Sequence, residues 1–396
     1  MTFARFARRS VLLLTVTVVA VCCLAIGAFA RFEVRTQTSL LPRSMGMLTM
    51  SCPSVDLCVA EGAGPSKGPF YTTMYSTHPS VGSSWKYLTN PPAPGGVASF
   101  SDNQITCPST HRCLDIGDHP LRRGQPDSAV YAIQDFDQPH PRWKLVGGGF
   151  KGAPGPADYL SCPTAGFCAE LATSQPARNL YGAFWLSAHP GAPGSWRQRP
   201  IPLNAYYLFC ASARLCLADV HVEGGARLMS IRDPLSSSSR WHDYPLPLLG
   251  HSSSIQSASC SSSGTCIMLV DRSRGVSVLT GSILTTSNVE GGPSTWITSF
   301  TARHLRFWPL FSRGSCFANG SCYATAGVQL NNSQNDNLSN EDHELAFSAD
   351  PGSGRASWKW IGAALSATCA TPLTCFGPVP APTFSHQAIE TIKFTR

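Results

Sequence analysis

Short runs in which apolar and polar residues alternate recur along the chain, separated by residues that favour turns. In each recurrence, one run ends at a cysteine, a turn rich in Pro, Ser and Gly follows, and a second cysteine opens an apolar run such as CVA or CIMLV. Alternation of period two between turn signals is typical of β-strands. Two further runs complete each unit, so we predict four short strands per repeat.

The repeat is marked by the motif Cys-x5-Cys, which occurs seven times. Successive first cysteines lie 55, 55, 48, 50, 56 and 53 residues apart, a period that fits a propeller blade and exceeds a leucine-rich or ankyrin repeat. The pairs are Cys52/Cys58, Cys107/Cys113, Cys162/Cys168, Cys210/Cys216, Cys260/Cys266, Cys316/Cys322 and Cys369/Cys375.

A second marker follows the third run of several units. That run ends in Ser-x-His/Asp-Pro, as in Ser76-Thr77-His78-Pro79, and a Gly/Ser turn then leads to a tryptophan. Large aromatic side chains commonly fill the layer between two packed sheets. We expect these residues to begin the fourth strands and to pack between neighbouring blades: Trp85, Trp143, Trp196, Trp241, Trp296 and Trp358.

The seventh unit lacks this tryptophan and ends soon after its third run, QAIETIKFT. The segment Phe32 to Leu41 precedes the first cysteine pair in the place that each tryptophan strand occupies before the next pair. An open ring would expose a sheet face and unpaired strand edges. We therefore predict an all-β, seven-bladed β-propeller over residues 31–396, with four-stranded antiparallel blades and with Phe32–Leu41 paired to the strand at 386–395.

The fourteen cysteines of the repeat are predicted to form seven local disulfides. Facing residues of an antiparallel hairpin lie about 4.5 to 5.5 Å apart at Cα, which a disulfide can bridge. Zinc is the alternative, but no second pair and no nearby His motif completes a tetrahedral ligand set, so we expect no metal. In the chain-entropy model, each disulfide restricts the unfolded chain and so stabilises the folded state by about 2 kcal/mol.

Residues 1–30 resemble an export signal. The basic stretch MTFARFARRS precedes an uncharged apolar run from Val11 to Ala30, which ends in the cleavage-like pattern Ala28-Phe29-Ala30. Twenty helical residues can also just span a bilayer, so an uncleaved membrane anchor over 11–30 is the alternative. Either reading places the rest of the chain outside the cytoplasm, as a secreted or membrane-anchored protein, where disulfides persist.

Composition agrees with this picture and excludes one class of partner. Charged residues make up 13% of the chain, whereas Gly (34) and Pro (31) are frequent, which suits many short strands joined by turns. The formal charge of +7 includes Arg5, Arg8 and Arg9 of the signal region, and falls to about +4 without these three residues. That is too little to indicate nucleic-acid binding.

With these motifs in place, the chain resembles exported bacterial propellers of the BNR/Asp-box-like type, in particular actinobacterial proteins with repeated SCPS-x3-C units. The resemblance covers residues 45 to 376. Ser348-Ala349-Asp350 with Gly352 and Trp358 approaches an Asp-box with a longer turn, whereas His78 and His189 occupy the Asp position elsewhere. Asp-boxes in that family are structural turns, so the resemblance implies the fold and no particular activity.

Propellers of this type include sialidases, which need an arginine triad for the substrate carboxylate, a nucleophilic Tyr–Glu pair and an Asp that acts as acid and base. No motif here marks that set, and sialidase propellers have six blades. Four acids do follow the second cysteine of a unit, namely Glu61, Asp115, Glu170 and Asp219. These acids could line the central channel and bind a cation or a sugar. However, Glu61 and Asp219 stand one position later after the cysteine than Asp115 and Glu170, which places them on the other face of the sheet. We therefore expect solvated charges on strand surfaces.

The remaining candidate residues show no common pattern. His111, His140, His251, His304 and His343 fall in different units and are expected to be solvated loop residues. The polar stretch Gln329 to Glu344 is predicted to be an exposed flexible loop. Its Asp336, Glu341, Asp342 and Glu344 could hold calcium loosely, but their spacing lacks the order of an EF-hand loop, so we expect an exposed loop without a bound ion. No nucleotide-binding or hydrolase fingerprint occurs, and no cofactor is expected.

Two functions remain open. The first is a non-catalytic extracytoplasmic module, expected to be monomeric, that binds a cell-surface protein or a glycan through loops of one propeller face. The second is a glycan-acting hydrolase or lyase whose acids converge only in the folded chain. We expect the first. The sequence assigns no catalytic residue and leaves the ligand-binding residues unknown.

Overall fold

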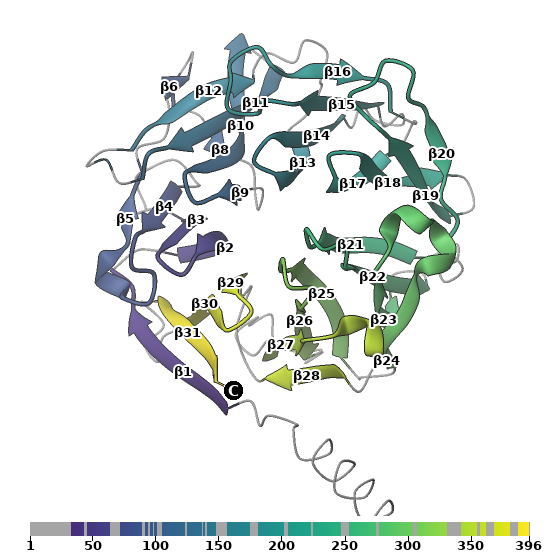
Figure 1. The fold of residues 1–396 in the computed structure, drawn as a ribbon. Coiled ribbons are helices and arrows are strands. Elements are labelled where there is room, and N and C mark those ends of the chain that lie inside the picture. Colours follow the sequence, from purple (N-terminus) through teal and green to yellow (C-terminus); the bar gives the residue numbers. More distant parts are fainter. Residues whose placement is uncertain are drawn as a thin grey trace, which may run out of the picture.

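The computed structural model of the chain is a ring of seven four-stranded antiparallel sheets around a central axis (Figure 1). In each blade the four strands follow one another from the axis to the periphery, as in other β-propellers. The structure describes residues 33–42, 46–63, 72–88, 92–93, 96–97, 99–100, 105–122, 125–136, 138, 141–147, 157–174, 181–201, 205–222, 225–246, 253–274, 277–303, 307–330, 342–354, 357–361, 368–380 and 387–395.

Six blades are built from consecutive strands, here listed from the innermost to the outermost. Blade 1 is β2 (Gly46–Ser54), β3 (Leu57–Ala63), β4 (Thr72–Ser76) and β5 (Lys86–Tyr87); blade 2 is β9 (Thr106–Ser109), β10 (Arg112–Arg122), β11 (Gln125–Gln134) and β12 (Trp143–Gly147); blade 3 is β13 (Ala157–Thr164), β14 (Phe167–Ser174), β15 (Tyr181–Ser187) and β16 (Arg197–Arg199). Blade 4 is β17 (Ala205–Ser212), β18 (Leu215–Val222), β19 (Gly225–Arg232) and β20 (Trp241–Asp243); blade 5 is β21 (Ser253–Cys260), β22 (Cys266–Arg274), β23 (Ser277–Thr286) and β24 (Ile297–Arg303); blade 6 is β25 (Phe307–Cys316), β26 (Cys322–Leu330), β27 (Asp342–Ser348) and β28 (Trp358–Ile361).

Blade 7 joins the two ends of the chain. It consists of β29 (Thr368–Thr371), β30 (Thr374–Pro380), β31 (Gln387–Thr395) and, as its outermost strand, β1 (Glu33–Leu40). Strand β1 pairs with β31 over its whole length, from Glu33 opposite Thr395 to Leu40 opposite Ala388. The predicted closure of the ring by the N-terminal strand is therefore confirmed.

The core lies between the blades. Because strand side chains alternate between two faces, one set from each blade meets the opposite set from the next. Leu114 and Ile116 of blade 2, for example, pack against Cys168 and Trp196 of blade 3, and all four are buried. The tryptophans stand at or just before the outermost strands of the six consecutive blades, as predicted, and five of the six are buried.

Two segments differ from the expectation. In blade 2 the short strand β8 (Ser99–Phe100) also pairs with β10, and β6 (Pro92–Ala93) pairs with β7 (Gly96–Val97) as a separate small hairpin. The polar stretch predicted as a loop from Gln329 to Glu344 is shorter than expected, because β26 runs to Leu330 and β27 begins at Asp342. Backbone pairing between these two strands, with Val328 opposite Asp342, overrides their polar side chains.

Short 3₁₀-helices η1 (Gly82–Ser84), η2 (Val289–Gly291), η3 (Pro293–Thr295) and η5 (Pro351–Ser353) lie between third and fourth strands. Residues 1–32, which include the predicted signal or anchor, Cys22 and Cys23, lie outside the described residues. Within the described part of the chain, no helix is long and apolar enough to cross a membrane.

The register of the closing strand can be tested by a new cross-link. Arg35 of β1 faces Lys393 of β31, and both side chains are exposed. We expect the R35C/K393C variant to form an eighth disulfide that peptide mapping by mass spectrometry detects, because facing positions have the Cα spacing that a disulfide needs. The Q37C/K393C variant is the matched control. A cross-link of equal yield in both variants would contradict this register.

Candidate functional site

One face of the propeller, which we call the disulfide face, carries two turns from each of the six blades built from consecutive strands. The inner turn joins the first and second strands, and the outer turn joins the third and fourth strands. The turn between the first and second strands is stapled by the Cys-x5-Cys disulfide, and the second cysteine pairs in register with the end of the third strand. Cys58, for example, faces Ser76, and Cys168 faces Ser187. The turn from the third to the fourth strand therefore lies on the same face. The inner turns surround the axis and the outer turns lie near the periphery.

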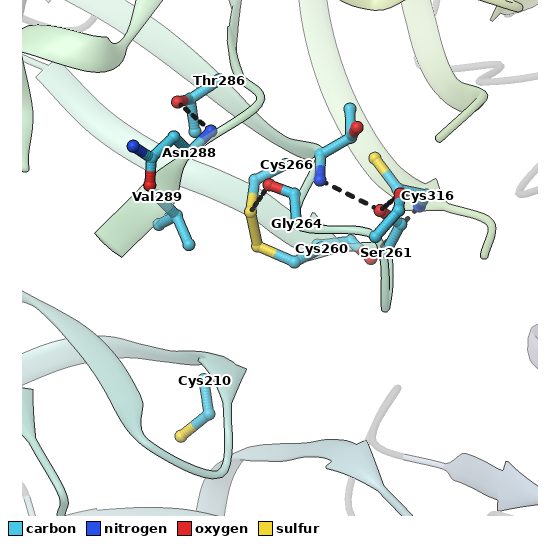
Figure 2. Close-up of a disulfide and its surroundings, with 12 residues drawn as sticks. Cys210, Cys260, Ser261, Gly264, Cys266, Thr286, Asn288, Val289 and Cys316 are labelled. Carbon is cyan, nitrogen blue, oxygen red and sulfur yellow. Dashed lines mark hydrogen bonds between the residues drawn. A yellow bond between two sulfur atoms is a disulfide. The ribbon is translucent and has the colours of Figure 1, made fainter. Parts of the chain in front are cut away.

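All seven predicted disulfides are present in the structure, with Cα–Cα distances of 3.8 to 4.2 Å, slightly shorter than expected for facing residues. They are Cys52–Cys58, Cys107–Cys113, Cys162–Cys168, Cys210–Cys216, Cys260–Cys266, Cys316–Cys322 and Cys369–Cys375. The last four pairs are directly facing residues of a ladder. Figure 2 shows the Cys260–Cys266 disulfide at the base of its turn, with Cys316 of blade 6 near it and Cys210 of blade 4 farther away.

The two cysteines of a pair differ in how far they are buried, and the spacing of the cysteines in the sequence does not predict this difference. The second cysteine of every pair is at most 1% exposed: Cys58, Cys113, Cys168, Cys216, Cys266, Cys322 and Cys375. The first cysteine is half-buried in four pairs: Cys107, Cys162, Cys260 and Cys316. The second cysteine opens a second strand, both faces of which are covered by neighbouring blades. The disulfides expected to be local staples of a turn are therefore also part of the core between blades.

The clusters around three of the second cysteines illustrate this role. Cys113 lies in a buried cluster with Leu57 and Val59 of the preceding blade. Cys216 lies in a cluster with residues of blade 3 such as Phe167 and Leu171, and Cys375 lies in one with residues of blade 6 such as Tyr323 and Phe347. The sulfur atoms thus contribute to packing between blades, while the turns that they close remain at the surface. Apolar tips such as Val55 and Leu373 are about two-fifths exposed, at 39% and 41%.

The outer turns are held by a pair of hydroxyl groups, which we call the hydroxyl clasp. In blade 3 the buried Ser187 hydroxyl accepts a bond from the His189 N–H at 3.0 Å and lies 2.7 Å from the Ser195 hydroxyl. The Ser195 hydroxyl in turn donates to the His189 carbonyl at 2.7 Å. Equivalent pairs occur in three other blades: Ser76 with Ser84, Thr286 with Thr295, and Ser348 with Ser357.

A different hydroxyl connects the inner strands of neighbouring blades. The serine that precedes the first cysteine accepts a bond from the backbone N–H of the next blade's first cysteine. The distances are 3.0 Å from Cys107 to Ser51, 2.9 Å from Cys210 to Ser161 and 3.3 Å from Cys316 to Ser259. The serine before the first cysteine therefore has a structural role, because its hydroxyl joins neighbouring blades.

Next to the axis, the residue three positions before the first cysteine also reaches the following blade. The Tyr159 ring packs edge-on against Tyr207 at 4.7 Å between ring centres. The Tyr207 hydroxyl accepts a bond from the Ala258 N–H at 2.8 Å, and the Ser257 hydroxyl accepts one from the Gly314 N–H at 3.0 Å. We call this series the inner belt.

Arg313 is the inner-belt residue of blade 6, and it reaches past blade 7 to blade 1. One Nη donates to the Met50 carbonyl at 2.7 Å and the other to the Thr49 hydroxyl. Burial lowers the pKa of Arg313, while the charges of Tyr323 and Glu61 act in the opposite sense. Because an arginine keeps its charge in proteins, the guanidinium supplies a fixed cation beside the axis.

The expectation of solvated acids is wrong for Glu61, Asp115, Glu170 and Asp219, all of which are at most 2% exposed. Opposite parity places two residues on opposite faces of a blade, but each of those faces is covered by a neighbouring blade. Glu61 points from blade 1 towards blade 2, and Asp115 points from blade 2 towards blade 1. The difference in parity thus brings these two carboxyls into hydrogen-bond contact. The other two acids lie between other pairs of blades.

Glu61 and Asp115 bring two buried carboxyls together in one interface between blades. Burial, followed by the charge and hydrogen bond of Glu61, raises the pKa of Asp115 well above its usual value. Asp115 also accepts a bond from the Ile116 N–H at 2.8 Å. Carboxyls that cleave glycosidic bonds stand about 5 to 9.5 Å apart with the sugar between them. Two carboxyls in direct contact inside a blade interface do not have that arrangement.

Three further acids are buried without such a pairing. Burial raises the pKa of Glu170 well above its usual value, and its carboxyl has no hydrogen-bond partner among the described residues. Burial likewise raises the pKa of Asp271 to about 7. Asp219 accepts a bond from the Ile255 N–H of the next blade at 3.3 Å. An uncompensated carboxylate is costly in such surroundings, so burial favours the protonated forms of Glu170 and Asp271.

The other sequence candidates are only partly within the described residues. His111 lies exposed on the stapled turn of blade 2, as predicted for a solvated loop residue. His140, His251, His304, Asp336 and Glu341 lie outside the described residues. His343, Asp342 and Glu344 belong to strand β27. Within the described residues, no group of three or more His, Cys, Asp or Glu side chains could hold a metal ion.

Sequence reasoning missed the second member of the hydroxyl clasp and the inner belt. The clasp has a readable signal, since Ser84, Ser195, Thr295 and Ser357 each stand directly before a tryptophan. The inner belt has none, because Thr49, Tyr159, Tyr207, Ser257 and Arg313 share only their distance from a cysteine and differ in chemistry.

No protein-family model and no curated protein matches the sequence. Among solved structures, the chain is similar to YCF48 bound to a D1 peptide, with 14% identity, a TM-score of 0.51 and coverage of 93% of this chain and 96% of that one. It is also similar to puromycin hydrolase, with 12% identity, a TM-score of 0.54 and coverage of 89% and 55%. Prolyl oligopeptidase B from Galerina marginata shows 11% identity, a TM-score of 0.50 and coverage of 80% and 42%. At these identities the likeness shows the propeller fold alone.

The hydroxyl clasp predicts a graded response to substitution. Ser195→Ala removes a donor to the His189 carbonyl and a partner of the buried Ser187, so we expect a loss of about 1 kcal/mol in the free energy of unfolding. Ser195→Thr should be tolerated, because Thr295 fills the same position in blade 5. Urea titration followed by tryptophan fluorescence measures both. Equal losses in the two variants would show that the hydroxyl is not what stabilises the turn.

The buried acids predict that stability falls as the pH rises. The folded pKa values of the buried Asp115, Glu170 and Asp271, and of the half-buried Glu390 on β31, are raised, so the folded chain binds more protons than the unfolded chain. The stability that these groups contribute is fully present below their pKa values in the unfolded chain, and it is lost as the pH rises through their pKa values in the folded chain. For Asp271 this loss takes place between about pH 4 and about pH 7.

Asp271→Asn should therefore melt at a higher temperature than the parent chain at pH 8 and show a smaller difference at pH 5. A difference of one between the folded and unfolded pKa corresponds to about 1.4 kcal/mol in the free energy of unfolding. Asp243→Asn, at an exposed acid, is the matched control and should leave the pH dependence unchanged. Calorimetry at pH 5 to 8 measures the effect, and a melting temperature that rises with pH in the parent chain would refute it.

Proposed function

We propose that this chain is an extracytoplasmic binding module that recognises a protein partner through the disulfide face. The observation that carries the proposal is the set of stapled turns around the axis. Their exposed tips are held by disulfides at their bases, and the outer turns on the same face are held by hydroxyl clasps. A preordered surface loses little conformational freedom on binding, which favours affinity.

The location and the partner class have separate support. Seven disulfides indicate an oxidising environment, which in most organisms lies outside the cytoplasm. Export through residues 1–30, as a cleaved signal or as an anchor, is part of the proposal. Val55 and Leu373 stand on the stapled turns of the neighbouring blades 1 and 7, and exposed apolar side chains in a polar surround are typical of protein interfaces. The similar YCF48 propeller was solved with a peptide, which agrees with this class of ligand.

The test begins with selection from a displayed library of random peptides on the purified, oxidised protein. We expect binders whose affinity falls about tenfold when Val55 and Leu373 are changed to Ser together, because about 1.4 kcal/mol of contact is lost. Leu145→Ser is the matched control, since Leu145 is equally exposed, at 43%, on the outer strand β12.

Two results would overturn the proposal. In one, no peptide is enriched while a glycan array gives specific ligands or a glycosidase panel shows turnover, which would favour the glycan-acting alternative. In the other, enriched peptides bind the V55S/L373S variant and the parent chain equally. In that case the binding surface lies elsewhere on the molecule.

A further inference from the structure

One position on the outermost strand of every blade can be defined by register alone. In each blade the second cysteine faces a residue on the third strand, and the residue before that one faces a position on the fourth strand. In blade 1 this relation runs from Cys58 to Ser76, and from Tyr75 to Lys86. The seven positions, which we call the outer ring, are Lys86, Lys144, Arg197, His242, Ile297, Lys359 and Gln37.

The outer ring is exposed and basic. All seven side chains are exposed, four carry a full positive charge and none is an acid. In the six consecutive blades the residue directly follows the tryptophan. None of Lys86, Lys144 and Arg197 takes part in an ion pair within the described part of the chain. The register places the ring next to the disulfide face in blades 1 to 6, because the facing third-strand residue there stands one or two positions from the end of its strand.

The surrounding charges increase this basic character. Two acids of the outer turns are already neutralised, since Asp233 pairs with Arg214 at 3.2 Å and Glu290 with Arg232 at 3.7 Å. Asp56, Asp135 and Asp350 remain as exposed acids of the stapled and outer turns. Further exposed cations stand near the same end of the outer strands: Arg35, Arg142, Arg240 and Lys393. The buried carboxyls between blades are screened from the surface and do not offset these charges.

Cations on outer strands also prevent edge-to-edge pairing between sheets. That role can be filled at any exposed position of an edge strand and requires no common register. Here the cations recur at one level, at the end of the strand that adjoins the exposed turns. The apolar tips Val55 and Leu373 lie inside this perimeter. An apolar centre within a charged rim is the anatomy of a protein interface and differs from a uniformly basic face that would bind lipid headgroups.

From this arrangement we propose that the partner presents an acidic polypeptide segment to the disulfide face, and that the outer ring attracts and holds it. The proposal rests on the binding function proposed above and specifies the chemistry of the partner. Complementary charge chiefly accelerates association and selects among partners. The interaction is therefore expected to weaken as salt rises.

The probe is fluorescein-labelled poly-L-glutamate, with binding to the full oxidised protein followed by fluorescence polarisation. We expect the K86E/R197E variant to bind about tenfold more weakly at low salt, and the difference to shrink at higher salt, where surface charges are screened. The R227E/R272E variant has the same net charge but alters two exposed cations towards the other end of the blades, and it should retain most of the affinity. Ile297→Lys adds the missing cation of blade 5 and should strengthen binding.

Melting curves of all variants verify that folding is unchanged. Equal losses in the two double variants would show attraction by net charge alone and overturn the proposal. It would also be overturned if vesicles containing phosphatidylglycerol bind with the same dependence on Lys86 and Arg197 while poly-L-glutamate does not bind. Peptides selected on the parent chain that depend on Val55 and Leu373 but ignore the outer ring would leave the binding function standing and remove only the acidic partner.

Discussion

The whole molecule depends on the burial of both faces of every blade. A four-stranded sheet with apolar residues on two sides is stable only between two neighbours, so the ring has to close. The pairing of β1 with β31 provides this closure and joins the first described strand to the last. Arg313 acts at the same seam on the axial side, where it links blade 6 directly to Thr49 and Met50 of blade 1. The seam is therefore closed by strand pairing within blade 7 at the periphery and by a direct bond between the two blades that flank it near the axis.

Closure also explains why acids are found in the core. Every face of a blade is an interior face, so an acidic residue on a second strand has no solvated side to turn to. Glu61 and Asp115 meet across one interface, whereas Glu170 and Asp271 are buried in others. Burial then favours the neutral forms, and the packing between blades is coupled to the proton concentration.

The cysteine spacing and the tryptophans are sufficient to predict the number of blades, the disulfides and the closing strand. These features are local, since each Cys-x5-Cys pair and each Trp turn is complete within one repeat. The burial of the acids, and of second cysteines such as Cys113, cannot be predicted in this way, because their environment belongs to another blade about fifty residues away. The Arg313 contact spans 263 residues and depends on ring geometry, which no periodicity in the sequence encodes. The outer ring is visible in the sequence once the register identifies the residue after each tryptophan as exposed.

The position of Glu33 opposite Thr395 has a consequence for the connectivity of the fold. The two ends of the described chain enter and leave side by side, at the end of blade 7 that adjoins the disulfide face. A short linker between them would make the backbone continuous, and the chain could then be opened between two other blades by circular permutation. In such a permutant all seven blades would be built from consecutive strands. Closure would no longer need a distant segment, and the order in which the blades assemble during folding would change while the packed ring stayed the same.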